Sequence, residues 1–95
     1  MAAYAVVQVE VTDPEVYETY KPLVPATIAK YGGEFVVRGG AIEVMEGTWP
    51  TERAVIIKFP SMADAKAWYH SDDYAGPMAI RHKSAKTNFV FVEGV

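Results

Sequence analysis

Residues 3–11 follow a period of two, and one face of the alternation is wholly apolar. That face carries Ala5, Val7, Val9 and Val11. A period of two with many β-branched residues predicts a half-buried β-strand. The strand is expected to end at "TDPE", where Thr12 and Glu15 have the spacing of a helix capping box and Pro14 suits a first helical turn.

The next segment has a helical pattern, because its apolar residues recur at spacings of three and four. These residues are Val16, Tyr20, Leu23, Val24, Ile28 and Tyr31. Pro22 and Pro25 fall inside the pattern and are expected to kink the helix or divide it in two, since proline donates no backbone hydrogen bond. Gly32-Gly33 then predicts the end of the helix.

A second strand is predicted over residues 34–46, interrupted at Gly39-Gly40, and a third over residues 53–59, with "GTWPTE" as the turn of a hairpin between them. The second glycine pair is expected to form a β-bulge that re-aims Arg38. The stretch "GGEFVVRGGAIEV" does not predict a phosphate-binding loop. It lacks the required lysine and Ser or Thr, and its first glycine pair closes a helix rather than opening one.

The rest of the chain repeats this order of elements. Ser61 and Asp64 predict the start of a helix, and Ser71 predicts the cap of a further helical stretch to about Lys83. The buried side of the first of these helices is expected to carry Met62, Ala65, Trp68 and Tyr69. A last strand follows at "KTNFVFVEG". The order β-α-β-β-α-β predicts one α+β domain over residues 1–95 with the ferredoxin-like split βαβ arrangement, a four-stranded antiparallel sheet with both helices on one face.

The second face of this sheet is expected to be apolar as well. The third strand sets Val55, Ile57 and Phe59 against Ala54 and Ile56, and the last strand sets Phe89 and Phe91 against Val90 and Val92. Leaving such a face in water is unfavourable by roughly 25 cal/mol per Å² of apolar surface. We therefore predict a homodimer in which the sheet faces pack together.

Composition narrows the classes of function. Hydrophobic residues make up 51% of the chain and charged residues 22%, which indicates a globular protein. The net charge of -3, with scattered Lys and Arg, argues against nucleic acid as a partner. The chain has no cysteine, so thiolate nucleophiles and thiolate metal sites are excluded. No apolar run approaches the ~20 residues that span a bilayer, so no membrane partner and a cytoplasmic location are expected.

Several blocks of the sequence resemble, in order, the signature segments of one bacterial family. The blocks are "VTDPEVYETY", "GGEFVVRGG", "EGTWPTERAVIIKFPS" and "AKAWYHSDDY", followed by Arg81. They are similar to the domain-of-unknown-function family 1330 of the dimeric α+β barrel superfamily, almost from end to end. The resemblance implies the dimeric α+β barrel fold but no single reaction. The superfamily includes cofactor-free monooxygenases, lactone isomerases, haem-degrading enzymes and non-catalytic members.

Two arginines are candidates for binding an anion. Arg38 is a charged residue in an otherwise apolar strand, where it either clamps a substrate carboxylate or enolate or forms a structural ion pair or solvated position beside a bulge. Arg81 opens the basic cluster "RHKSAK", which either forms a solvated face at a helix end or contributes an anion site.

The two helical regions also carry many aromatic residues: Tyr17, Tyr20, Trp68, Tyr69 and Tyr74. Aromatic residues at helical spacing most often form core. In this fold they would also line a pocket between helices and sheet. Tyr20, Trp68 and Tyr74 are therefore candidates for an apolar ligand site whose polar end is Arg38 or Arg81.

His70 and His82 belong to no metal-binding pair, so no metal site and no cofactor are expected. Each fits a helix end, and a proton-transfer role for His70 stays open. Glu46 and Arg53 are expected to form an ion pair across the base of the hairpin rather than a catalytic group. Trp49-Pro50 at its tip is either a binding aromatic or a contact with the dimer partner.

Three functions remain open on the sequence. The first is a small-molecule-binding barrel, with a cofactor-free reaction in which Arg38 or Arg81 stabilises an oxyanion and a tyrosine or His70 moves a proton. The second is a non-catalytic interaction or ligand-sensing module. The third is a haem-handling barrel with a helix histidine, His70 or His82, as axial ligand.

Overall fold

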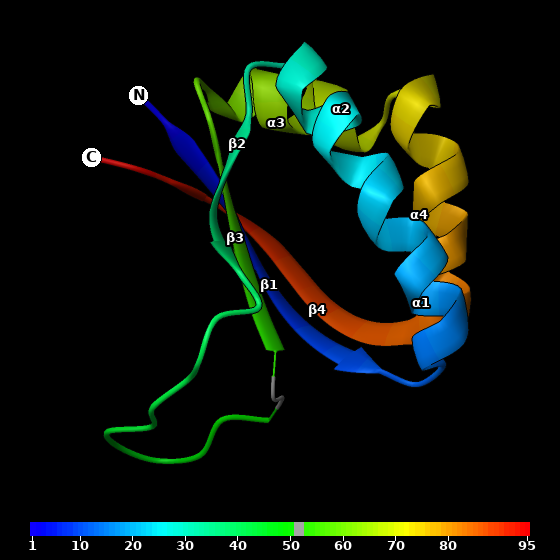
Figure 1. Cartoon of the computed structure of the whole chain (residues 1–95). Helices are drawn as coiled ribbons and strands as arrows, with labels where there is room; N and C mark the ends of the chain where they lie inside the picture. The colour runs from blue at the N-terminus through cyan, green and yellow to red at the C-terminus, as the bar shows by residue number, and fades with distance from the viewer. Residues whose placement is uncertain (51–52) are drawn as a thin grey trace.

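The computed structural model describes residues 1–50 and 53–95, which form a four-stranded sheet in the order β2-β3-β1-β4 with helices on one face (Figure 1). All neighbouring strands are antiparallel. The strands are β1 Ala3–Val11, β2 Glu34–Arg38, β3 Arg53–Phe59 and β4 Ala85–Glu93. The helices are α1 Pro14–Tyr20, α2 Val24–Lys30, α3 Met62–Tyr69 and α4 Asp72–Ser84. The predicted α+β, ferredoxin-like fold is confirmed.

The core lies between the sheet and the helices, and Trp68 of α3 is at its centre. Trp68 is fully buried, with its ring centre 4.1 Å from that of Tyr74 in α4 and 6.2 Å from that of Phe89 in β4. Its indole Nε1 donates a hydrogen bond to Thr27 Oγ1 in α2 at 3.0 Å. One side chain therefore ties two helices and an edge strand to α3, with its polar atom satisfied.

The first helical region is divided at its prolines, as predicted. A 3-10 turn, η1 Lys21–Leu23, separates α1 from α2, because Pro22 and Pro25 remove backbone donors there. The predicted N-cap was wrong by one residue. Asp13, not Thr12, caps α1 by accepting a hydrogen bond from the Val16 amide at 3.3 Å.

The prediction for β2 was wrong in length and in the position of its bulge. The strand ends at Arg38 instead of continuing to residue 46, because Gly39 adopts a positive φ of 69°. The register shift falls between Phe35 and Val37, not at Gly39-Gly40. The bulge places Arg38 opposite Val55, whereas a regular ladder from Phe35 would place it one residue further, on the other face of the sheet.

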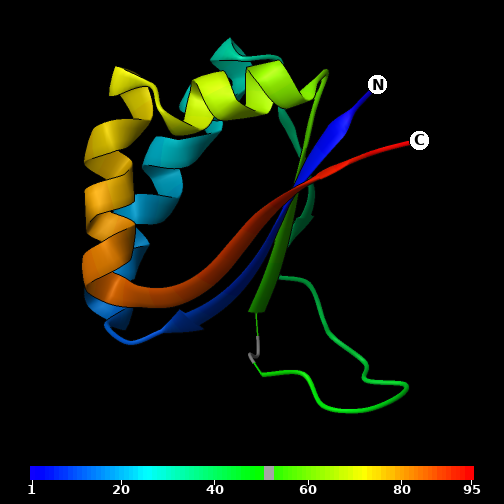
Figure 2. The same ribbon diagram turned by 180° about the vertical axis from the view of Figure 1, so that it is seen from behind.

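Beyond Arg38 the chain leaves the sheet as an arm, residues 39–50. Seen from the front and from behind, this arm projects away from the helical layer (Figures 1 and 2). Glu46 lies exposed in the arm, beyond the end of β2, so it does not face Arg53 across paired strands and the predicted cross-strand arrangement was wrong. The predicted turn "GTWPTE" falls partly on residues 51 and 52, which lie outside the described residues.

Gly33 stands where the end of the first helical region meets β3. A Cβ there would lie 2.5 Å from Ile28 Cγ2 and 2.7 Å from Phe59 Cε1, both core side chains. We expect Gly33→Ala to lower the free energy of unfolding by about 1–3 kcal/mol, because neither neighbour can withdraw without repacking the core. Gly40→Ala is the matched control, since a Cβ at Gly40 meets nothing within 4 Å. Equal stability of the two variants in urea unfolding would contradict the close packing at Gly33.

Candidate functional site

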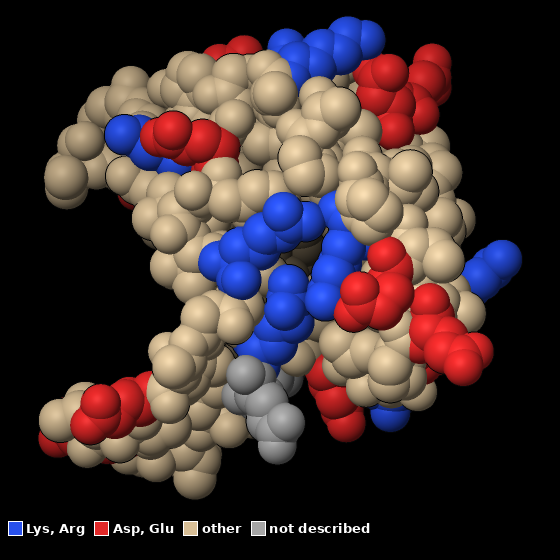
Figure 3. Space-filling model, viewed as in Figure 1, with Lys and Arg blue, Asp and Glu red and all other residues tan. Residues whose placement is uncertain are grey.

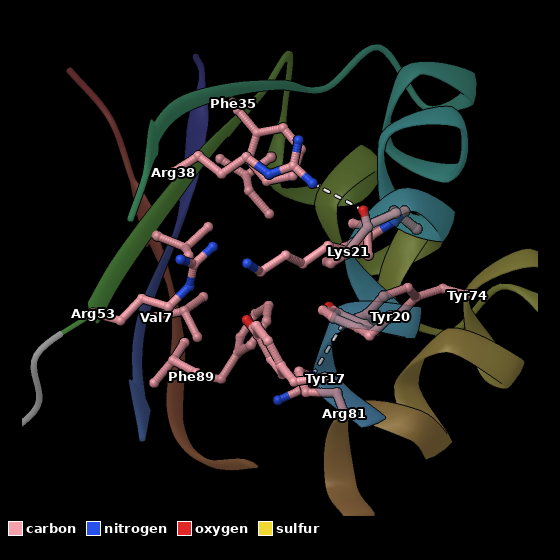
Figure 4. Close-up of a pocket in the computed structure, with 15 residues that line it drawn as sticks. Val7, Tyr17, Tyr20, Lys21, Phe35, Arg38, Arg53, Tyr74, Arg81 and Phe89 are labelled. Carbon is pink, nitrogen blue, oxygen red and sulfur yellow. Dashed lines mark hydrogen bonds between the residues drawn. The ribbon is translucent and has the colours of Figure 1, made fainter. Parts of the chain in front are cut away.

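A cleft opens between the helices and the inner face of the sheet. Its walls are largely apolar and include Val7, Val24, Phe35, Ile57, Trp68 and Phe89 (Figure 4). The space open to the centre of a water molecule inside it is about 30 Å³. About 10–15 Å³ on this measure holds one water, so the cleft is a narrow slot rather than a filled core.

The polar groups of the cleft are strongly biased in charge. Four cationic side chains line it, Lys21, Arg38, Arg53 and Arg81, and none of the described lining residues is an acid. The whole chain has only 9 Lys and Arg residues and a net charge of -3. Lys and Arg side chains accordingly gather around a hollow between sheet and helices (Figure 3). A cleft lined by one sign of charge concentrates counter-ions, so this one attracts anions.

Arg81 lies deepest among these cations and is only 3% exposed. Its Nη1 donates to Thr87 Oγ1 at 2.6 Å, and its Nε donates to the Tyr74 hydroxyl at 3.2 Å. Its Nη2 lies 3.5 Å from His82 Nε2, a weak contact. Within the described part of the chain no carboxylate pairs with Arg81. A guanidinium has five N–H donors, so two remain for a ligand.

Tyr74 and Tyr20 extend this polar group across the cleft. Their hydroxyl oxygens are 2.7 Å apart, and both side chains are buried. Burial raises the pKa of Tyr20 far above its usual value, Tyr74 raises it further by charge and by the hydrogen bond, and Arg81 opposes the shift. Burial also raises the pKa of Tyr74, against the opposing charge of Arg81. Both phenols therefore keep their protons, and one hydroxyl proton of the pair is not used within it.

The charge of Arg81 is secured by the same tyrosines. Burial lowers the pKa of Arg81, but the neighbouring Tyr74 and Tyr20 outweigh it, so the net shift is upward. The guanidinium also lies with its Cζ 5.2 Å from the centre of the Phe89 ring. The base of the cleft is thus a positive group held in place by hydroxyl oxygens that accept its hydrogen bonds and by an aromatic ring.

The other three cations stand at the mouth of the cleft (Figure 4). Arg38 Nη2 donates to the Lys21 carbonyl at 2.8 Å, and its guanidinium lies 4.5 Å from the centre of the Phe35 ring. Lys21 Nζ and Arg53 Cζ lie 5.9 Å and 5.6 Å from the centre of the Tyr17 ring. Three elements, η1, β2 and β3, therefore bring their cations toward one opening.

The structure brings together five of the six residues that the sequence nominated. Tyr20, Arg38, Trp68, Tyr74 and Arg81 all line the cleft. His70 does not: it is exposed at the C-cap of α3, with its ring against Tyr69. No histidine is among the described lining residues, so neither His70 nor His82 stands in this cleft as the axial ligand of the haem hypothesis.

Sequence reasoning missed Lys21 and Arg53 as lining residues, and it placed Tyr17 in the aromatic set without nominating it for the ligand site. Arg53 carried a usable signal, since it shares the parity of Val55 and Ile57 and therefore faces the helices. Lys21 lies one helical turn after Tyr17. The sequence does not show that Arg38 and Arg53, which come from distant strands, line the same cleft.

Neither a metal-binding cluster nor a membrane-spanning helix occurs in residues 1–50 and 53–95. No group of three or more His, Cys, Asp or Glu side chains there is placed to hold a metal ion. No helix in that part of the chain has the length and apolarity to cross a bilayer.

Comparison with known proteins places the fold among proteins of largely unknown function. Residues 2–95 match the family described as a domain of unknown function, DUF1330. No curated protein matches the sequence. A protein of unknown function from Rhodopseudomonas palustris is similar in structure, with a TM-score of 0.80 and 14% identity over 99% of this chain and 82% of that one.

Two further solved structures are similar. A dimeric ferredoxin-like protein of unknown function from Jannaschia sp. CCS1 has a TM-score of 0.77 and 14% identity, covering 99% of this chain and 100% of that one. SnoaB, a cofactor-independent oxygenase from Streptomyces nogalater, has a TM-score of 0.67 and 10% identity, covering 99% of this chain and 93% of that one. At these identities the likeness concerns the fold alone.

The buried phenols of Tyr20 and Tyr74 predict that the folded protein loses stability at alkaline pH. Below the ordinary tyrosine pKa of about 10 the folded and unfolded states hold the same phenol protons. Above about pH 10 the unfolded chain releases them first, so stability is expected to fall as pH rises. Tyr20→Phe should make that fall shallower in urea unfolding across this range. Tyr31→Phe, outside the cleft, controls for the loss of a hydroxyl, and an unchanged slope in Tyr20→Phe would contradict the assignment.

Proposed function

We propose that this chain, which belongs to the DUF1330 family, binds a small organic anion bearing a carboxylate or enolate group in the cleft between sheet and helices. The observation that carries the proposal is Arg81, a guanidinium that is 3% exposed and has no carboxylate partner among the described residues. A buried charge without a counter-ion costs several kcal/mol. An anionic ligand would remove that cost.

The hydrogen-bonding capacity of the site supports the same ligand class. Arg81 has two unused N–H donors, and the Tyr20–Tyr74 pair has one unused hydroxyl proton. Carboxylate and enolate oxygens are acceptors without donors, and a guanidinium fork matches the two oxygens of a carboxylate. The apolar walls would receive the hydrocarbon part of the ligand.

A cofactor-free reaction at this site is the second candidate function, favoured by the tyrosine pair. Arg81 would stabilise negative charge on an enolate oxygen, and the spare phenol would deliver its proton to the substrate, leaving a phenolate next to the Arg81 charge. The structural neighbour SnoaB is a cofactor-independent oxygenase, which is support by fold analogy only. A ligand-sensing module would use the same contacts without turnover. Detection of a product, as opposed to binding alone, distinguishes the two.

The binding proposal predicts that small carboxylates stabilise the protein. At a hundred times its dissociation constant a ligand raises the unfolding free energy by about 2.7 kcal/mol. In a thermal-shift screen of small carboxylic acids and aromatic lactones, we expect the acids to raise the melting temperature. Arg81→Lys should weaken their binding by about tenfold or more, because it keeps the charge but loses the fork.

Lys83→Met is the matched control, because Lys83 is an exposed cation of the same helix that does not line the cleft. It should bind the acids as the wild type does. The melting temperature of each variant without ligand shows whether it is folded. Equal loss of binding in both variants would reduce the effect to net charge and contradict the proposed role of Arg81.

We also propose that a second copy of the chain covers the outer face of the sheet. Val36, Val90 and Val92 are each about half exposed on this face, at 54%, 54% and 50%. The arm of residues 39–50 projects on the same side and exposes Ile42, Val44, Met45 and Trp49. Apolar surface of this extent favours association. The similar protein from Jannaschia is described as dimeric.

Light scattering after size exclusion should therefore find twice the mass of one chain. Val90→Asp is expected to shift the protein toward the monomer, because it places a charge within the apolar contact. Ala79→Asp adds the same charge at an exposed position of α4 and should leave the dimer intact. A wild-type monomer at micromolar concentration would contradict the proposed sheet-to-sheet contact.

A further inference from the structure

We propose that the ligand of this cleft is an elongated, flat molecule with an acidic group at each end, one held by Arg81 and the other by Lys21, Arg38 and Arg53. This inference rests on the proposed function and names the class of ligand. A single carboxylate at Arg81 would leave the positive lining at the mouth, Arg38 above all, without an anionic ligand group. Like charges brought together are unfavourable, and a second anionic group would offset that repulsion.

The two positive ends lie at opposite edges of the sheet. Arg38 belongs to β2, and Arg81 contacts Thr87 and Phe89 of β4. With the strand order β2-β3-β1-β4, these edges are three strand spacings apart, roughly 14 Å between backbones. The cleft thus runs across the strands, and Val7 of β1 and Val55 of β3 form its floor. A compact monoanion cannot reach both ends.

The outer end is exposed enough to admit a ligand group. Lys21 forms an ion pair with Glu18 at 2.7 Å, but both side chains are partly exposed, so this pair is weak and exchangeable. The Arg38 guanidinium is fixed by the Lys21 carbonyl and by the Phe35 ring and still has unused N–H donors. These contacts orient the cation before a ligand arrives, which lowers the entropic cost of binding.

The middle of the cleft suits a flat body. Phe35 stands near the outer end and Phe89 near the inner end, with Trp68 and Tyr17 also lining the space. Aromatic rings pack favourably against planar conjugated groups. The free volume of about 30 Å³ has room for about two or three waters, so any ligand body requires the walls to move apart, and a flat body requires the least movement. An aromatic or conjugated dicarboxylate matches the chemical character of all three parts of the cleft.

The test compares diacids with their monoamides, which have nearly the same shape but one charge fewer. Fumarate, terephthalate and 2,6-naphthalenedicarboxylate give three lengths, and calorimetry measures each diacid and its monoamide on the full chain. We expect at least one diacid to bind about tenfold or more tightly than its monoamide, as a charge-assisted contact predicts. Arg38→Met should reduce that advantage and leave the affinity for the monoamide unchanged. Lys83→Met, outside the cleft, should preserve the advantage.

Each outcome bears on the inference separately from the proposed function. If every diacid binds within about threefold of its monoamide, which is less than one charge-assisted contact supplies, the second anionic end is wrong and the binding of a single acid at Arg81 stands. If no diacid binds but benzoate does, the two-ended ligand is again overturned and the proposed function is retained. If neither diacids nor monocarboxylates bind, both proposals fail.

Discussion

The buried guanidinium of Arg81 is the interaction on which the arrangement of this molecule depends. It stands on α4, donates to Thr87 of β4 and to Tyr74 of its own helix, and through Tyr74 reaches Tyr20 of α1. These contacts join the first and second halves of the chain at one charged point. Because a buried cation is costly unless it is well hydrogen-bonded, the helices must keep their spacing around it. The cleft is the space that this spacing leaves beside Trp68.

The acidic and the basic side chains of the protein have different structural roles. The chain is acidic as a whole, yet none of its described acidic residues lines the cleft, and Glu18 reaches it only through its ion pair with Lys21. Asp13, Asp64 and Asp72 serve helix N-termini, where a carboxylate is favourable. The acids therefore stabilise local structure, and the cations converge from separate elements. Neither net charge nor isoelectric point reports such a separation.

Much of the fold could be predicted because the helices and strands follow from the local spacing of apolar residues. The bounds of β1 and β3, and the caps at Ser61 and Ser71, follow from residues a few positions apart. The site is less accessible, because its members meet only through tertiary structure. Arg53 was assigned to a local ion pair although its parity placed it on the inner face. His70 follows Trp68 by two residues at the C-terminal end of α3. The rotation of the chain between the two positions turns the His70 side chain to solvent.

The bulge at Val36 has a consequence for how such a chain can vary. In a paired strand successive side chains point to alternate faces of the sheet. One extra residue reverses this alternation for the residues that follow it in the strand. The face of the sheet to which Arg38 points is thus determined by the register of β2 against β3. If β2 instead paired with β3 without the bulge, Arg38 would lie opposite Ala54, and its positive charge would move from the cleft to the outer face while every other strand kept its place. A change of register alone would therefore alter the charge of the cleft and the charge of the outer face together, with no substitution of any residue that lines the cleft.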